Sequence, residues 1–255
     1  MSTTRINGSL YTDIQNKIAT VVFGHPSSNC FPSELLERLS KEIISLGNND
    51  AVLIIILKSE GTKAFCAGAS FDELVAISNL EEGRLFFSGF ANVINAMRTC
   101  GKLIIGRVQG KAVGGGVGLI AACDYVFATE SAAIKLSEFT IGIGPFVIEP
   151  AVTRKIGVAG TAALTLDATD WKNAYWAKEK GLYAKVFESI SDADKEVSAF
   201  TTKLASYNPA ALAEMKKVLW KGTEEWNLLL AERTAISGKL VLSEFTKTAL
   251  LKFKK

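Results

Sequence analysis

Five consecutive positions near the middle of the chain, Gly114-Gly115-Gly116-Val117-Gly118, could do chemistry with their backbone alone. They lie between an apolar run typical of a buried strand and a run of small residues typical of a helix. Glycines let another molecule approach the main chain closely, and the N–H groups at a helix start carry partial positive charge. The cluster is therefore a candidate site for a phosphate, or for an oxygen that becomes negative during a reaction.

Three kinds of site compete for this glycine cluster. A phosphate-binding P-loop ends in Gly-Lys-Ser/Thr, whereas this chain has Gly118-Leu119-Ile120. A dinucleotide fingerprint is formally present as Gly116-x-Gly118-x-x-Ala121, but it lies past residue 100 and leaves little room for the second half of such a fold. An oxyanion hole needs a second backbone donor, for which the loop 64–70 is the candidate. Adjacent parallel strands would bring that loop and the glycine cluster to one edge of a sheet.

The elements that would position these loops follow an α/β pattern. Alternating apolar residues predict a hairpin-like opening, and Pro32 and Gly47 are typical of the start and end of a helix. Continuous apolar runs predict buried parallel strands with helices between them. The expected strands are 10–13, 18–23, 52–57, 103–108 and 125–128, with helical spacing from Phe86 to Met97 and a small-residue helix up to Cys123. From Asp192 onward the pattern is helical, over 192–207, 209–220, 224–242 and 243–254.

Composition argues against several classes of protein. A chain of 255 residues with 48% apolar and 22% charged residues indicates one large folded domain, or a domain with an appended subdomain. The net charge is 29 − 26 = +3 without a block of five like charges, which argues against nucleic acid as a partner. A single histidine and four cysteines without a C-x-x-C pair argue against a zinc site, so we expect no metal. The first 16 residues do not resemble a signal peptide, and no apolar run reaches the roughly 20 residues that span a bilayer. We therefore expect a cytoplasmic protein without membrane contact.

The residues around both loops resemble motifs of the enoyl-CoA hydratase/isomerase (crotonase) superfamily. The stretch 63–69 resembles the family's AFCAGAD motif, and 108–116 resembles its V-x-G-x-A-x-GGG motif. Matches continue through Ala122-Cys123-Asp124, Leu136-Ser137-Glu138 and Arg154-Lys155-Ile156-Gly157, so that the similarity spans 7–255. The resemblance implies a spiral of ββα turns, expected at 1–191, and a C-terminal helical region, expected at 192–255. In this family such helices build homotrimers that often pair into hexamers.

The resemblance also implies which residues form the site. An acyl-CoA thioester would be the substrate, and no separate cofactor is expected because coenzyme A is part of that substrate. By motif position, the N–H groups of Ala69 and Gly115 would bind the thioester oxygen, and Glu138 would exchange the proton at the α carbon. Desolvation in an apolar acyl pocket would raise the pKa of Glu138 toward neutrality. Further contacts to the substrate are expected from Ala67, Ser70, Phe71, Asp72, Gly114 and Gly118.

One of the two glutamates typical of hydratases in this family is missing. It would follow the glycine triplet by two positions, where this chain has Gly118. Glu149 is a candidate second carboxylate, or a single carboxylate could shuttle one proton. The stretch 136–148 and Gly116-Val117-Gly118-Leu119 resemble bacterial methylglutaconyl-CoA hydratases of leucine breakdown, which also lack this glutamate.

We therefore expect an enoyl-CoA hydratase, with 3-methylglutaconyl-CoA as a candidate substrate. Two alternatives stay open. The first is an enoyl-CoA isomerase that uses Glu138 as its single base, and the second is a non-catalytic member that binds acyl-CoA or RNA.

Overall fold

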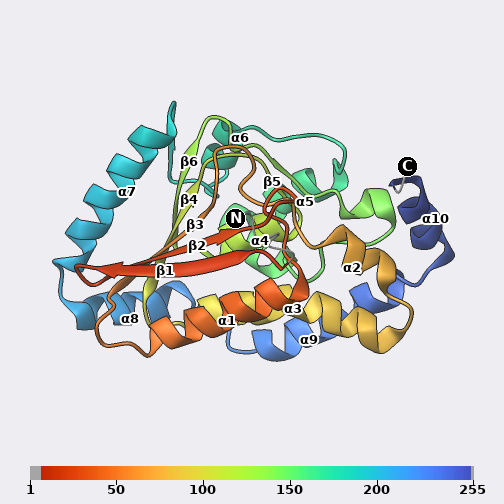
Figure 1. Cartoon of the computed structure of the whole chain (residues 1–255), viewed down its shortest axis with the longest axis horizontal. Coiled ribbons are helices and arrows are strands. Elements are labelled where there is room, and N and C mark those ends of the chain that lie inside the picture. The colour runs from red at the N-terminus through yellow and green to blue at the C-terminus, as the bar shows by residue number, and fades with distance from the viewer. Residues whose placement is uncertain (1–6, 254–255) are drawn as a thin grey trace, which may run out of the picture.

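The structure is a computed structural model that describes residues 7–253. Within these residues, a hairpin and four further strands form one twisted sheet (Figure 1). The first two strands pair antiparallel, and every later pairing in this sheet is parallel. The order across the sheet is β1 (Ser9–Gln15), β2 (Ile18–Gly24), β3 (Ile54–Ser59), β4 (Leu103–Val108), β6 (Tyr125–Thr129) and β8 (Lys185–Phe187). Two short parallel strands, β5 (Ala112–Val113) and β7 (Ile134–Lys135), form a second sheet.

Alternation along β3 divides the core between the two faces of the main sheet. Ile55 and Leu57 face the cluster that α1 (Ser33–Gly47), α3 (Leu80–Thr99) and α4 (Gly115–Ala122) complete. Ile54 and Ile56 face the opposite side, which α7 (Ile190–Ala205) covers. Because both faces are buried between Ile54 and Leu57, this part of β3 has no polar face, which explains its continuous apolar sequence.

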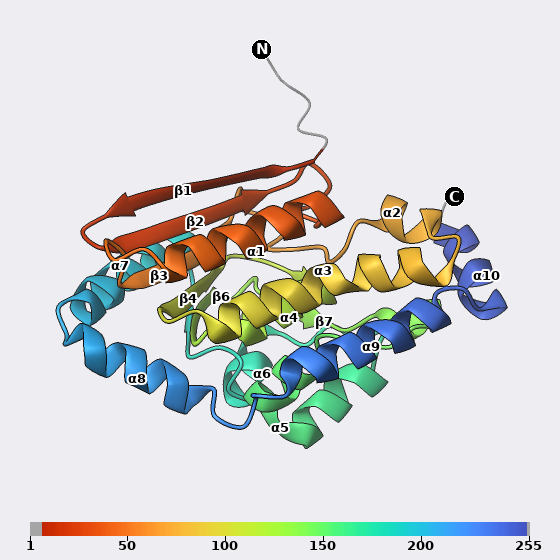
Figure 2. The same cartoon turned by 90° about the horizontal axis from the view of Figure 1, so that it is seen from below.

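The long helix α9 (Trp226–Leu240) lies along α3 (Figure 2). A Cβ built on Gly83 of α3 would lie 2.9 Å from the Cα of Gly238 in α9, so the two helices approach at a distance that only glycine allows. Asp124 also holds the C-terminal region on the core. It accepts hydrogen bonds of 2.7 Å from Nζ of Lys216 and Nε1 of Trp220, at the end of α8 (Pro209–Leu219). The C-terminal helices therefore pack against the core of their own chain.

The predicted α/β fold is confirmed, and so are the strands on either side of the two loops. The predicted tail helices are confirmed: α7 begins and ends two residues earlier than predicted, and α8, α9 and α10 (Glu244–Phe253) are shorter than predicted. Residue 254 of the last predicted helix lies outside the described residues, as do residues 1–6 and 255. The sequence reading did not predict α2 (Phe71–Ala76), α5 (Glu149–Leu166), α6 (Ala174–Glu179) or the 3-10 helix η1 (Glu138–Ile141). The division into a core at 1–191 and an oligomerisation region at 192–255 stays a prediction.

No helix within residues 7–253 is both long enough and apolar enough to cross a lipid bilayer.

Candidate active site

The two loops singled out in the sequence lie side by side, as predicted. Cys66 and Ala112 form a parallel β-bridge, and the N–H of Val113 donates a 3.0 Å hydrogen bond to the carbonyl oxygen of Cys66. A Cβ built on Gly68 would lie 3.2 Å from the carbonyl oxygen of Val113 and 3.9 Å from the amide nitrogen of Gly115. Backbone pairing after β3 and β4 thus brings together segments almost fifty residues apart.

The amides of Ala69 and Gly115 are left without partners by this pairing. Phe31 donates to the carbonyl of Gly68 at 2.8 Å and accepts from the N–H of Ser70 at 2.9 Å. Because neighbouring residues of a parallel strand alternate in direction, the N–H of Ala69 points away from Phe31. Gly115 is the first residue of α4, where an N–H has no partner inside the helix. Across residues 7–253 neither amide donates a hydrogen bond, and both residues line the same cavity.

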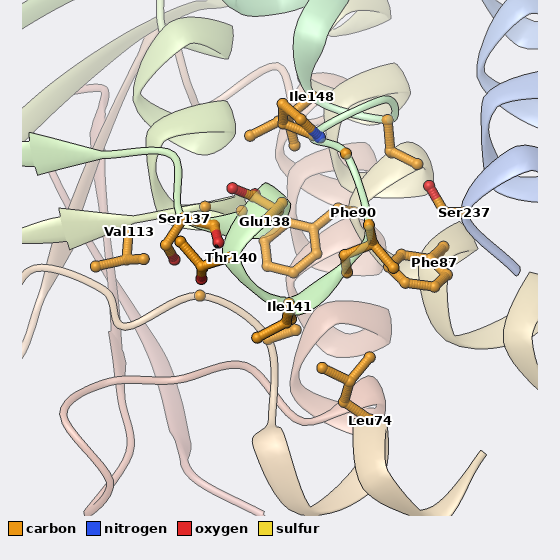
Figure 3. A pocket seen from close by; sticks show the side chains of 18 of the residues that line it. Leu74, Phe87, Phe90, Val113, Ser137, Glu138, Thr140, Ile141, Ile148 and Ser237 are labelled. Atoms are coloured by element: carbon orange, nitrogen blue, oxygen red, sulfur yellow. Dashed lines mark hydrogen bonds between the residues drawn. The ribbon is translucent and has the colours of Figure 1, made fainter. Parts of the chain in front are cut away.

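That cavity has a volume of about 580 Å³, within the range of small-molecule sites. Its walls are mainly apolar and come from α2, α3, the glycine cluster, η1 and the segment before α5 (Figure 3). Among the described residues that line it, Glu138 is the one carboxylate and Lys135 the one cation. The cavity can therefore hold an apolar chain beside a single acidic group.

Glu138 is the first residue of η1, and its carboxyl group is packed against the glycine cluster. A Cβ built on Gly114 would lie 2.8 Å from Oε1 of Glu138, so the absence of a side chain at Gly114 lets the carboxyl group approach. Oε2 is buried and has no hydrogen-bond partner in the described structure. Burial raises the pKa of Glu138 from about 4.5 to about 7, against a smaller opposing effect of its own backbone N–H. At neutral pH this carboxyl group can therefore either accept or donate a proton.

The other predicted contact residues divide into two groups. Ala67, Phe71 and Gly114 line the cavity, whereas Ser70 and Asp72 are not part of its lining. The Oγ of Ser70 accepts a 3.3 Å hydrogen bond from the N–H of Glu73 and so caps α2. Asp72 lies exposed in the first turn of the same helix.

Gly118 and Glu149 also lie outside the cavity lining. A Cβ built on Gly118 would lie 2.4 Å from Cγ2 of Ile148, which does line the cavity. Oε1 of Glu149 accepts a 2.6 Å hydrogen bond from Oγ1 of Thr153, and its Oε2 lies 3.9 Å from Arg233. Glu138 therefore remains the one carboxylate among the described residues of the cavity lining.

Much of the cavity wall carries no signal in the sequence. Phe86 and Phe90 were recognised by their helical spacing, but this spacing does not tell a core face from a cavity wall. Ser237 of α9 also lines the cavity, and no local signal marks it because its neighbours in the wall belong to distant segments.

Cys66 of the donor loop is fully buried, and burial raises the pKa of its thiol to about 12, so this thiol stays protonated and does not act as a nucleophile.

A cationic and aromatic cluster adjoins the cavity. The Nζ atoms of Lys111 and Lys135 each lie 4.7 Å from the centre of the Trp171 ring, and Lys135 also lines the cavity. Trp171 is partly exposed. The cluster combines two positive charges with an accessible aromatic face.

The fold and these loops define a protein of the crotonase type. The sequence matches the model of the Enoyl-CoA hydratase/isomerase family over residues 13–249, and the chain belongs to this family. The family resemblance predicted from the two loop motifs is thereby confirmed.

Comparison with individual proteins shows moderate similarity. The chain is 28% identical to the short-chain-enoyl-CoA hydratase of Clostridium acetobutylicum, over 94% of this chain and 92% of that protein. It is 30% identical to the mitochondrial methylglutaconyl-CoA hydratase of Homo sapiens, over 77% of this chain and 58% of that protein. The crystal structure of an enoyl-CoA hydratase from Bacillus halodurans matches with a TM-score of 0.87 at 24% identity, covering 95% of this chain and 99% of that chain. This structural match confirms the predicted fold. Methylglutaconyl-CoA hydratase is one of several distant relatives.

Proposed function

We propose that this protein is an enoyl-CoA hydratase, which adds water reversibly to the α,β double bond of an acyl-CoA thioester. The observation that carries the proposal is the carboxyl group of Glu138, buried against Gly114 in an apolar cavity and unpaired at Oε2. A carboxyl group with a pKa near 7 suits proton exchange at neutral pH.

The first step is polarisation of the thioester. Its carbonyl oxygen would accept hydrogen bonds from the N–H groups of Ala69 and Gly115, which have no other acceptor among residues 7–253. Negative charge that develops on this oxygen in the enolate would then be stabilised by two fixed dipoles, at roughly 3 kcal/mol for each donor. Because the donors belong to the backbone, this step requires no side chain at either residue.

A single carboxylate can complete the hydration. The ionised Glu138 takes a proton from water as the water oxygen bonds to the β carbon, and the double-bond electrons move to form the enolate. The carboxyl group then returns this proton to the α carbon as the thioester carbonyl re-forms. No proton is gained or lost by the protein over the cycle.

The coenzyme A portion would bind beside the cationic cluster. Its phosphates are anionic and its adenine is aromatic, which matches Lys111, Lys135 and Trp171 at this side of the cavity. For the acyl portion, 3-methylglutaconyl-CoA is one candidate, supported by the similarity to the human enzyme of that name.

A second candidate function is isomerisation of an enoyl-CoA. It is favoured by the presence of one carboxylate, Glu138, among the described residues of the cavity lining. This reaction needs one base, which removes a proton from C2 of a 3-enoyl thioester and returns it to C4.

The absorbance of the conjugated 2-enoyl thioester separates the two reactions. Hydration lowers this absorbance when a 2-enoyl-CoA is supplied, whereas isomerisation raises it when a 3-enoyl-CoA is supplied. Tight acyl-CoA or RNA binding with neither change across a panel of chain lengths would contradict both and favour a non-catalytic role. The homotrimer or dimer of trimers stays a prediction that analytical ultracentrifugation can test.

A further inference from the structure

One polar side chain in the cavity wall has no function in the mechanism above. Ser237 lies on α9 and is 1% exposed, and it lines the cavity. Its Oγ is buried and has no hydrogen-bond partner in the described part of the chain. Figure 3 shows this oxygen directed toward the cavity rather than along its own helix.

Two other buried hydroxyl groups on helices of this protein form local hydrogen bonds. Thr234, one turn earlier on α9, donates a 2.7 Å hydrogen bond to the carbonyl oxygen of Ala231. Thr201 on α7 donates a 2.8 Å hydrogen bond to the carbonyl oxygen of Val197. Serine in a helix commonly bonds to the carbonyl of the preceding turn, and Ser237 does not. A buried hydroxyl without a partner is unfavourable, so its persistence beside a cavity points to an external partner.

The position of Ser237 follows from the packing of two helices. Gly83 and Gly238 let α3 and α9 approach closely, and this contact places the adjacent Ser237 at the cavity wall. Most of the cavity lining is apolar and includes Phe86, Phe87 and Ile148. In Figure 3, Ser237 and Val113 lie at opposite ends of the view, with Glu138 between them. Val113 immediately precedes the glycine cluster proposed to bind the thioester, so an acyl chain that runs past Glu138 would extend toward Ser237.

We propose that Ser237 determines specificity by donating a hydrogen bond to an oxygen at the distal end of the acyl chain. The substrate class is therefore an acyl-CoA whose chain ends in a carbonyl or carboxylate group rather than a methyl group. This inference rests on the proposed function, because it takes the acyl chain to occupy this cavity. Arg233, one turn earlier on α9, has a buried Nε without a hydrogen-bond partner in the described structure. Arg233 is not part of the cavity lining, and its Nη2 lies 3.9 Å from Oε2 of Glu149, so we assign it no contact with the acyl chain.

Binding of saturated acyl-CoA thioesters tests the inference, because these compounds cannot be hydrated. Three thioesters of equal chain length are compared by isothermal titration calorimetry: one ending in a methyl group, one in a methyl ketone and one in a carboxylate. We expect the wild-type protein to bind at least one oxygen-bearing thioester about tenfold more tightly than the methyl-ended one. In Ser237→Ala the ratio of the two dissociation constants should fall to about one. The helix is preserved in this variant because alanine is a strong helix former.

Thr165→Val is the matched control. Oγ1 of Thr165 is also buried and unpartnered in the described structure, but Thr165 is not part of the cavity lining. This variant should keep the full preference. The inference is wrong if the wild-type protein prefers the methyl-ended thioester or shows no preference, or if Ser237→Ala retains the preference.

Turnover of the corresponding 2-enoyl thioesters is measured separately. A binding preference that depends on Ser237, without turnover of any enoyl thioester, would contradict the proposed hydratase and support the inference. Turnover without any preference for an oxygen-bearing chain would support the hydratase and contradict the inference.

Discussion

Ile148 occupies the space that a side chain at Gly118 would need. A Cβ at position 118 would lie 2.4 Å from Cγ2 and 2.7 Å from Cβ of Ile148, distances that no packed side chain tolerates. Position 118, where hydratases of the family typically carry the first of two glutamates, is therefore packed so closely by Ile148 that it has no room for a side chain. As a consequence, Glu138 is the one carboxylate among the described residues of the cavity lining.

Substitution of Gly118 should be costly for this reason. We expect Gly118→Ala to lower the free energy of unfolding by about 1–3 kcal/mol, because the added methyl group overpacks the site. In the double variant with Ile148→Ala the two effects should partly cancel, which gives a coupling energy near 1 kcal/mol or more. Urea unfolding of the four proteins in this cycle measures it. If the effects of the two substitutions on the free energy of unfolding are additive, Ile148 is not what excludes a side chain at position 118.

Glu138 should be required for catalysis. Glu138→Gln keeps the size of the side chain but cannot exchange the proton, so kcat should fall by about 10²–10⁴-fold. Glu149→Gln is the matched control, because Glu149 pairs with Thr153 outside the cavity lining and should retain most of the activity. The reverse pattern, with Glu149 required and Glu138 dispensable, would reassign the catalytic carboxylate.

The rate should depend on pH through Glu138. Both directions of hydration begin with the ionised carboxylate, and its pKa is raised to about 7 by burial. We therefore expect kcat/KM to be level above about pH 8 and to fall nearly tenfold per pH unit well below pH 7. Steady-state rates between pH 5 and 9 measure the profile. A midpoint near the ordinary value of a glutamate would mean that burial does not perturb this group in the free enzyme.

The same shift predicts a pH-dependent stability. The pKa of Glu138 is higher in the folded chain than in the unfolded chain, so between about pH 4.5 and 7 the folded chain binds the proton more tightly. Raising the pH through this window therefore lowers the free energy of unfolding, by at most about 3 kcal/mol at ~1.4 kcal/mol for each pKa unit. Glu138→Gln removes this contribution, so it should gain stability relative to wild type as the pH rises. Urea unfolding at pH 5 and pH 8 tests this, and an equal difference between the two proteins at both values would contradict it.

Lys135 should contribute to binding of coenzyme A. Because this cation lines the cavity beside Trp171, we expect Lys135→Ala to raise KM for an acyl-CoA several-fold with little change in kcat. The effect should shrink at high salt, where charges near the surface are screened. Lys41→Ala serves as the control, since Lys41 is exposed on α1 and pairs with Glu37. A fall in kcat at unchanged KM would assign Lys135 to the chemical step instead.

Much of the fold could be predicted from local patterns. The run 103–108 coincides with β4, and the start of β2 was predicted to the residue. Both strands have a continuous or alternating apolar pattern, which predicts a strand. The segment 129–191 could not be predicted as well. Its strands β7 and β8 are only two and three residues long, too short for an alternating apolar pattern. The helix α5 contains Gly157 with a left-handed φ of 69°, which interrupts the helical spacing of its apolar residues.

The sequence by itself determined the family, and it predicted the two backbone donor loops and Glu138 as the site, because these predictions depend on residue types that recur in fixed local motifs. Only the tertiary structure decided which residues surround that carboxyl group. It showed that Ile148 fills the place next to Gly118, that Glu149 turns to Thr153, and that Ser237 reaches the cavity through the close contact of α3 and α9. These relationships join residues up to about 150 positions apart, and close packing in three dimensions leaves no periodic or motif signal in the chain.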